Sequence, residues 1–269
     1  MVLIDSDSTL RKYVPNVFAS VKGEASLFDK LSPFLMTAEQ WLEQNFCAVS
    51  IQTEDALPTA QKLVVCEALR NAVPSLDLVL TQNGFGIVSN TNIAPASKER
   101  VERLIDSLRE QRDDLIAQLL PMLADIEEWR SSDRYAFFSA IMFPDLRLTT
   151  LCGYSENRWE HYLQLRLEAI NIEASLAEEY FSEALMDRLR SEVICKNVPM
   201  GDKALVAGIR SQIVAVLMGK PISQRHMTDL VNYVRNNAEL FPEWHNSDTA
   251  KLFSPPKFEN KKENKGYWF

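Results

Sequence analysis

The sequence predicts a mainly α-helical protein: a helical bundle with one small β-hairpin and an extended C-terminal arm. In most of its 269 residues, apolar side chains recur every three or four positions, which is the period of one helix face. One stretch instead places apolar residues on both sides of an Asn-Gly dipeptide, which favours a hairpin. We therefore expect an N-terminal helical region at residues 1–143, a C-terminal helical bundle at 144–252 and a docking arm at 253–269.

A first helix, which Asp7 or Ser8 could cap and Pro15 interrupts early, and two longer helices are predicted before the hairpin. Residues 25–46 place most of their apolar side chains on one helical face. Pro33 marks either a kink or a boundary in this stretch, and in the second case Thr37 caps a separate short helix. Residues 57–73 form the next helix, which stops before Pro74.

Residues 76–90 carry the one clear β signal. Asn83-Gly84 suits a tight two-residue turn, because both turn positions need a positive φ. Gly86, within the second strand, indicates a bulge or a close backbone approach. An isolated two-stranded hairpin is marginally stable in water, so we expect it to lean on the helices or to pair with a neighbouring subunit.

The longest helical stretch follows the hairpin. Ser97 caps it, and its apolar stripe continues through Trp129 with a kink at Pro121. Residues 130–154 are less regular and include the β-prone LRLTTL, so the boundary between two helical halves falls there. Short connections in the second half favour antiparallel neighbours. Its helices are expected at residues 158–196, 203–218 and 223–240.

The charge distribution sets the arm apart from the body. The whole chain has a net charge of −8, whereas residues 253–269 carry four lysines and two glutamates, a formal charge of +2. The body is therefore about −10, which argues against binding to a phosphate backbone, so we expect no sequence-specific nucleic acid partner. No apolar run is long enough to cross a bilayer and no secretory leader is recognisable, so we expect no membrane partner and assembly in a cytosol.

Patterns that indicate catalysis, a metal or a cofactor are weak. His161, His226 and His245 lie in unrelated contexts, and the four cysteines are far apart, so we expect reduced thiols, no metal site and no cofactor. Cys152 with Glu160-His161 is the nearest approach to an activated thiol with an oriented histidine. The alternative for His161 is a partly buried structural role. Adjacent carboxylates point about 100° apart on a helix and do not face one substrate, so we expect no enzyme.

The closing segment FSPPKFENKKENKGYWF joins a charged stretch to three consecutive aromatic residues. Its two prolines favour an extended start. Burying each terminal ring is worth roughly 1.5 to 3 kcal/mol, so we expect Tyr267, Trp268 and Phe269, together with Phe258, to bind a partner. The alternative is a tail that folds back on its own body.

Two stretches resemble an uncharacterised structural protein family of Bacteroides-type phages and prophages. They are LTQNGFGIVSN at residues 80–90, followed by Asn92, Pro95-Ala96-Ser97 and Arg100, and the closing FENKKENKGYWF. The resemblance implies a head-to-tail connector, a neck or adaptor component of the virion that is assembled in the bacterial host cytoplasm. It implies no catalytic residue.

We therefore predict a virion structural protein of a tailed phage, whose copies form a ring that joins the portal to the tail or neck proteins. The predicted partner-binding residues are Phe258, Tyr267, Trp268 and Phe269 of the arm, and Gln82, Asn83, Gly84 and Phe85 at the hairpin tip. Two alternatives stay open. One is a monomeric intracellular regulator that uses the aromatic tail as a short linear motif, and the other is an enzyme with an unrecognised helical site.

Overall fold

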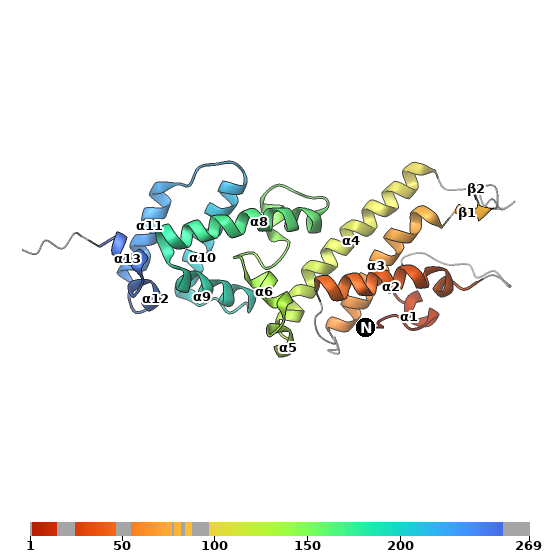
Figure 1. Ribbon diagram of the computed structural model, residues 1–269, viewed down its shortest axis with the longest axis horizontal. Helices are drawn as coiled ribbons and strands as arrows, with labels where there is room; N and C mark the ends of the chain where they lie inside the picture. Colours follow the sequence, from red (N-terminus) through yellow and green to blue (C-terminus); the bar gives the residue numbers. More distant parts are fainter. Residues whose placement is uncertain are drawn as a thin grey trace, which may run out of the picture. The chain divides into compact units, whose positions relative to one another are not determined.

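The computed structural model describes residues 2–14, 25–46, 55–76, 78–81, 84–87 and 97–254. The chain divides into two compact units: unit 1 is Met1–Leu167 with Val193–Asn197, and unit 2 is Glu168–Glu192 with Val198–Phe269. Thirteen α-helices account for most of the described residues (Figure 1). The prediction of a mainly helical protein is therefore confirmed.

Unit 1 is built around three helices of which the middle one, α3, packs against both α2 and α4. Most residues of α3 are buried for this reason. In chain order the elements of unit 1 are α1 (Asp7–Arg11), α2 (Leu27–Asn45), α3 (Ala56–Ala72), the 3-10 helix η1 (Val73–Ser75), β1 (Leu78–Thr81), β2 (Gly84–Ile87), α4 (Lys98–Ala124), α5 (Glu127–Arg130), α6 (Asp133–Ser139), α7 (Arg147–Leu151) and the first part of α8 (Arg158–Leu176).

A single helix, α2, spans the position of Pro33. Ser26 begins it with a capping box, in which its side chain accepts from the Asp29 N–H and the Asp29 carboxylate accepts from the Ser26 N–H. Thr37 does not cap a second helix, because its hydroxyl donates to the Pro33 carbonyl at 3.0 Å. The buried apolar face continues on both sides of the proline, so packing outweighs the cost of about 3 kcal/mol that an interior proline imposes.

The two strands β1 and β2 pair antiparallel, with Leu78 opposite Ile87 and Thr81 opposite Gly84. This register makes Gly84 a strand residue, whereas we expected it in the turn. Residues 82–83 and the side chains of both strands lie outside the described part of the chain.

Five aromatic rings form the centre of unit 1, where the end of α2 meets α5, α6 and the start of α8. They are Phe46, Trp129, Phe138, Trp159 and Tyr162, and all five are buried. The Phe46 ring centroid lies 6.0 Å from that of Phe138 and 4.7 Å from that of Trp159. The Trp129 indole also donates to the Phe46 carbonyl at 2.7 Å.

The division of the chain differs from the expected boundary at residues 143/144. Residues 144–167 cluster with unit 1 because the start of α8 buries its aromatic side chains there, and the Tyr162 hydroxyl donates to the Phe143 carbonyl at 2.9 Å. The β-prone LRLTTL forms helix α7 instead of a strand. Its Thr149 is buried and donates its hydroxyl to the Leu146 carbonyl at 2.7 Å, which satisfies this β-branched side chain within the helical turn.

Unit 2 is helical throughout its described residues. Its elements are the rest of α8, the π-helical turn η2 (Ala177–Phe181), most of α9 (Glu183–Ile194), α10 (Met200–Leu217), α11 (Gln224–Asn236), α12 (Pro242–His245) and α13 (Asp248–Leu252). The last two helices are short and were not predicted. Helix α10 begins directly after Pro199, three residues before the predicted start.

The nearly forty-residue helix predicted from Arg158 onward is wrong, because the chain breaks between α8 and α9. The break consists of η2 followed by Ser182, which has φ 68° and ψ 148°. Neither proline nor glycine marks it in the sequence. A contact distant in the sequence holds the broken turn, since the Trp244 indole donates to the Tyr180 carbonyl at 2.7 Å.

Replacing Ser182 should separate backbone strain from the capping of α9. Ser182→Ala keeps the positive φ and loses the hydroxyl that accepts from the Leu185 N–H at 3.4 Å. Ser182→Gly also loses the hydroxyl, but glycine adopts this backbone without a Cβ penalty. We expect the glycine variant to be more stable than the alanine variant by about 1 kcal/mol in urea unfolding. The opposite order would show that Ser182 is not strained.

Candidate interaction surface

Most of the residues predicted to bind a partner lie outside the described part of the chain. They are Phe258, Tyr267, Trp268 and Phe269 of the arm, and Gln82 and Asn83 of the hairpin tip. Gly84 and Phe85 begin β2, opposite Thr81 and Leu80. What the structure does define is the point at which the arm leaves the body.

The arm leaves unit 2 after α13, which is fixed against η2. The Phe253 ring lies 6.1 Å from the Trp244 ring and 6.4 Å from the Tyr180 ring. The Thr249 hydroxyl donates to the Ala177 carbonyl at 3.4 Å, and Trp244 is almost completely buried. The chain is therefore packed almost to its last described residue. We call α12 and α13 with Phe253 the arm root.

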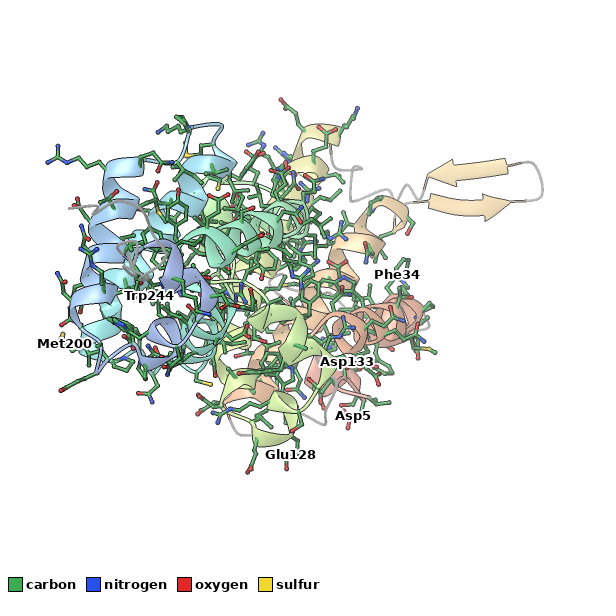
Figure 2. All side chains as sticks on the ribbon, turned by 60° about the vertical axis from the view of Figure 1, so that its left-hand side comes forward. Asp5, Phe34, Glu128, Asp133, Met200 and Trp244 are labelled. Carbon is green, nitrogen blue, oxygen red and sulfur yellow. The ribbon has the colours of Figure 1, made fainter. Side chains whose placement is uncertain are left out.

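Unit 2 has two exposed apolar side chains that come from separate elements, Met200 at the start of α10 and Leu240 before α12. They are 82% and 47% exposed. A Cβ added to Gly201 would lie 3.0 Å from Leu240 Cδ1, so the leucine covers the residue next to Met200. Figure 2 shows Met200 at the margin of the helices and Trp244 inside them. We call this the Met200–Leu240 surface.

An ion cluster centred on Arg188 borders this surface. The guanidinium lies 2.5 Å from Glu192, 2.7 Å from Asp202 and 2.9 Å from Glu243, and it donates to the Leu240 carbonyl at 3.3 Å. Burial raises the pKa of Glu192, although the hydrogen bond and charge of Arg188 oppose the shift. With three carboxylates ionised against one guanidinium, the formal charge of the Arg188 cluster is −2.

This surface was not predicted from the sequence. Two signals were present: Arg188 and Glu192 have the i,i+4 spacing of a helical ion pair, and Gly201 lies within the first turn of a helix, where glycine has no conformational advantage. The structure gives a reason for the glycine, because a Cβ there would lie only 3.0 Å from Leu240 Cδ1 and the leucine would have to shift by a few tenths of an ångström. Neither signal alone indicates which residues distant in the sequence come together.

A second ion cluster, centred on Arg112, is buried in unit 1. Arg112 Nη2 lies 2.7 Å from both Asp113 and Glu160, and Nη1 lies 3.9 Å from Glu67. Asp113 also accepts from the N–H of Arg158, the first residue of α8, at 2.8 Å. Burial disfavours the Arg112 cation, but its carboxylate partners outweigh this and raise its pKa. The Arg112 cluster therefore joins α3, α4 and α8.

Glu160, the carboxylate that could have oriented His161 for catalysis, is instead bound to Arg112 in this cluster. Both oxygens of Glu160 accept from Arg112, at 2.8 and 2.7 Å. The neighbouring His161 instead stacks on Tyr154, with 4.0 Å between ring centroids. Among the buried thiols, burial raises the pKa of Cys66 to about 11, which keeps it protonated. Within the described ranges, no three His, Cys, Asp or Glu side chains are grouped to hold a metal ion.

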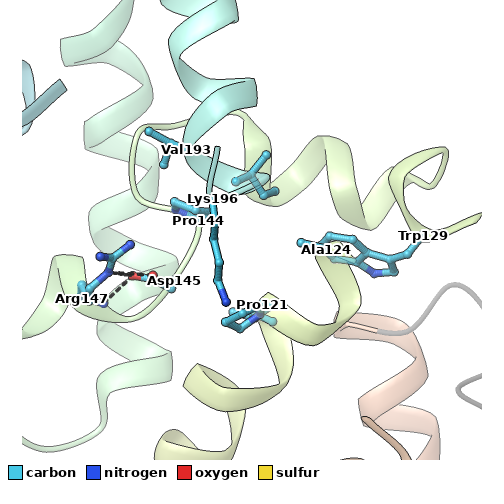
Figure 3. Close-up of a pocket in the computed structure, with 10 residues that line it drawn as sticks. Pro121, Ala124, Trp129, Pro144, Asp145, Arg147, Val193 and Lys196 are labelled. Atoms are coloured by element: carbon cyan, nitrogen blue, oxygen red, sulfur yellow. Dashed lines mark hydrogen bonds and ion pairs between the residues drawn. The ribbon is translucent and has the colours of Figure 1, made fainter. Parts of the chain in front are cut away.

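Unit 1 contains a small cavity and an open hollow. The cavity has a volume of about 30 Å³, room for about one water molecule, and lies between Pro121, Trp129 and Lys196 (Figure 3). Arg147 at its rim pairs with Asp145 at 2.8 Å. The hollow has a volume of about 400 Å³. Its lining consists of Asp55, Asp125, Glu127 and Glu128 with Met122 and Ile126.

The helices in the described part of the chain are not long and apolar enough to cross a membrane.

A family model matches residues 25–139 and 222–254, more than half of the chain. The chain belongs to DUF6712, a family of unknown function. The matched ranges contain α2, α3 and α4 of unit 1 and the arm root of unit 2, so both the packed three-helix group and the exit of the arm fall within the DUF6712 match. No curated protein and no solved structure gives a significant match to the chain.

Replacing Arg112 should destabilise the DUF6712 chain strongly. Arg112→Met leaves Asp113, which is 1% exposed, without its guanidinium, and breaking a buried pair in this way costs about 3–5 kcal/mol. The matched control is Arg109→Met on the same helix, whose exposed partner Asp106 makes the expected cost about 0–1 kcal/mol. Urea unfolding of both variants tests this. Equal losses would mean that solvent reaches Asp113.

The contribution of Glu160 to stability should depend on pH. Burial raises its pKa, but the hydrogen bond and charge of Arg112 more than offset this, so the pKa lies below its ordinary value. A carboxylate of this kind stabilises the fold above its unfolded-state pKa, about 4.3, and the contribution is lost as the pH falls through the folded-state pKa.

Glu160→Gln should therefore lower the free energy of unfolding at neutral pH by less than about 1 kcal/mol, because the side chain is about half exposed. The difference between the variant and the parent should narrow progressively in urea titrations taken down to about pH 3. A difference that stays constant with pH would show that Glu160 acts through packing instead of charge.

Proposed function

We propose that this protein is a virion structural component of a tailed phage, a head-to-tail connector whose copies form a ring between the portal and the tail. The helical bodies pack laterally against one another, and the C-terminal arm docks on the next protein of the particle. The role is one of assembly and not of catalysis.

The observation that carries the proposal is the fixed arm root. The body is packed up to Phe253, and the segment beyond it holds two prolines, four lysines and three terminal aromatic residues. Fifteen residues reach at most about 50 Å at 3.3–3.6 Å per residue. A fixed root with an apolar end at that reach suits attachment to a neighbouring protein, and a ring adds many weak attachments through effective concentration.

Exposed apolar side chains on both units support lateral packing. They include Met36, Leu151, Leu163 and Leu167 in unit 1, and Met200, Met218, Leu240 and Leu252 in unit 2. Single exposed apolar residues are common on any protein, so the proposal requires several of them to share one interface. A specific interface buries roughly 1,200–2,000 Å² in total.

The pair of strands β1 and β2 is the second contact that we propose, through its tip at Gln82 to Phe85. Two strands on their own leave unpaired N–H and C=O groups along both edges. A neighbouring subunit or neck protein that adds a strand would satisfy these groups and stabilise an otherwise marginal element.

The assignment to a phage particle rests on the sequence resemblance around residues 80–100 and in the closing segment. The DUF6712 match includes the first of these stretches and ends at residue 254. The function of the DUF6712 family is unknown, so the match leaves the assembly role to experiment.

Removing residues 255–269 should leave the body folded and abolish incorporation into particles. Trp244, Thr249 and Phe253 all remain in the truncated chain, so the arm root keeps its contacts. We expect a Tm within a few degrees of the parent's, measured by circular dichroism. Incorporation is measured as the amount of the protein that sediments with particles.

A full-length variant with Tyr267, Trp268 and Phe269 replaced by serine is the matched control, since it keeps the length and charge of the arm. It should lose incorporation to the same degree as the truncated chain. Unfolding of the truncated chain, or normal incorporation of either variant, would contradict the docking role.

A further inference from the structure

We propose that in the unassembled subunit the arm folds back on its own chain, so that its aromatic end covers the Met200–Leu240 surface and its lysines lie beside the Arg188 cluster. The inference rests on the proposed docking function, because it concerns where the arm lies before it docks.

The aromatic end of the arm and the Met200–Leu240 surface are both apolar. Met200 is 82% exposed and Leu240 is 47% exposed, and the Leu240 side chain lies against Gly201, the residue next to Met200. Tyr267, Trp268 and Phe269 are the largest apolar group outside the described residues. In a free subunit their exposure would favour aggregation, and contact with an exposed methionine and leucine removes both apolar surfaces from water.

The Arg188 cluster and the arm carry opposite net charges. Three carboxylates against one guanidinium give the Arg188 cluster an excess of negative charge directly beside Leu240. The exposed Lys203 and Glu239 are sequence neighbours of Asp202 and Leu240, and their formal charges cancel each other. The side chains of Glu243 and Glu192 are 28% and 16% exposed, so part of this negative charge faces solvent. The arm brings four lysines and a formal charge of +2, which complements this excess.

The Arg188 cluster lies close to the arm root in the same chain, which favours binding of that chain's own arm over the arm of a second copy. Glu243 of the cluster immediately precedes Trp244, whose ring is 6.1 Å from that of Phe253 at the arm root. Leu240 lies four residues before Trp244 and so at most about 15 Å from it, and the fifteen residues beyond Ser254, which span up to about 50 Å, are long enough to reach back to it. A short linker gives an effective concentration in the millimolar range, above that of a second subunit at micromolar concentration.

If the arm folds back, docking requires its aromatic end to leave the Met200–Leu240 surface and bind a site on the partner instead. A partner in the particle must offer the aromatic end a better site than the Met200–Leu240 surface does, because the free arm is already covered. The same contact would keep unassembled subunits from sticking to one another through their aromatic ends.

Photocross-linking on the full-length chain tests the proposal. The photoreactive amino acid p-benzoylphenylalanine takes the place of Trp268, and mass spectrometry of the monomer band locates the attachment. We expect attachment at Met200 or Leu240, with a yield that does not change when the protein is diluted. Attachment between two copies, attachment at the acidic hollow around Glu127, or no attachment would each overturn the proposal.

Matched variants of the arm test the charge step without disturbing the body. Replacing the four arm lysines, Lys257, Lys261, Lys262 and Lys265, by glutamine should lower the cross-linking yield severalfold. Replacing Glu259 and Glu263 by glutamine should raise it. Equal yields from both would overturn the part of the proposal that rests on the Arg188 cluster.

The cross-linking and particle-incorporation experiments distinguish a failure of the fold-back proposal from a failure of the proposed docking function. If the truncated chain fails to enter particles and no cross-link forms, the docking function stands and fold-back fails. If the cross-link forms but the truncated chain enters particles normally, fold-back stands and the docking function fails.

Discussion

The hydrogen bond from the Trp244 indole to the Tyr180 carbonyl holds the corner on which unit 2 depends. At this corner the chain turns back from α8 into α9, with Ser182 at a positive φ that costs a residue other than glycine of order 1–3 kcal/mol. Burial of the Trp244 ring, worth roughly 1.5–3 kcal/mol or more, offsets that cost. The same tryptophan fixes α12 and contacts Phe253, so the corner and the arm root are stabilised by one side chain.

Buried charges determine how helices pair once such a corner exists. Arg190 of α9 reaches back to Glu173 of α8 at 2.9 Å, and Glu173 is fully buried. Arg112 does the same for α3, α4 and α8 in unit 1. A buried ion pair adds little net stability compared with well-packed apolar groups, but an unpaired buried charge is very costly. Alternative helix pairings that separate these partners are therefore strongly disfavoured, which favours one arrangement within each unit.

Local periodicity predicted the helices whose ends carry local signals. Ser26 and Asp29 form a capping box, and α3 stops just before Pro74, so both boundaries followed from nearby residues. The failures lie where distant contacts outweigh local preference. Pro33 remains inside α2 because a continuous buried face supports it, and Ser182 ends a helix without proline or glycine because Trp244, more than sixty residues away, binds the turn. No local rule contains such contacts, which is why the break escaped prediction.

The arm could be predicted from the sequence, whereas the Met200–Leu240 surface could not. The arm was recognisable because its composition is extreme within one short segment: basic, proline-containing and aromatic at its end. The Met200–Leu240 surface was not, because forty residues separate its two apolar members and its charges come from α9, α10 and α12. Each of these residues is ordinary in its own sequence context. Only the fold brings them together beside the arm root.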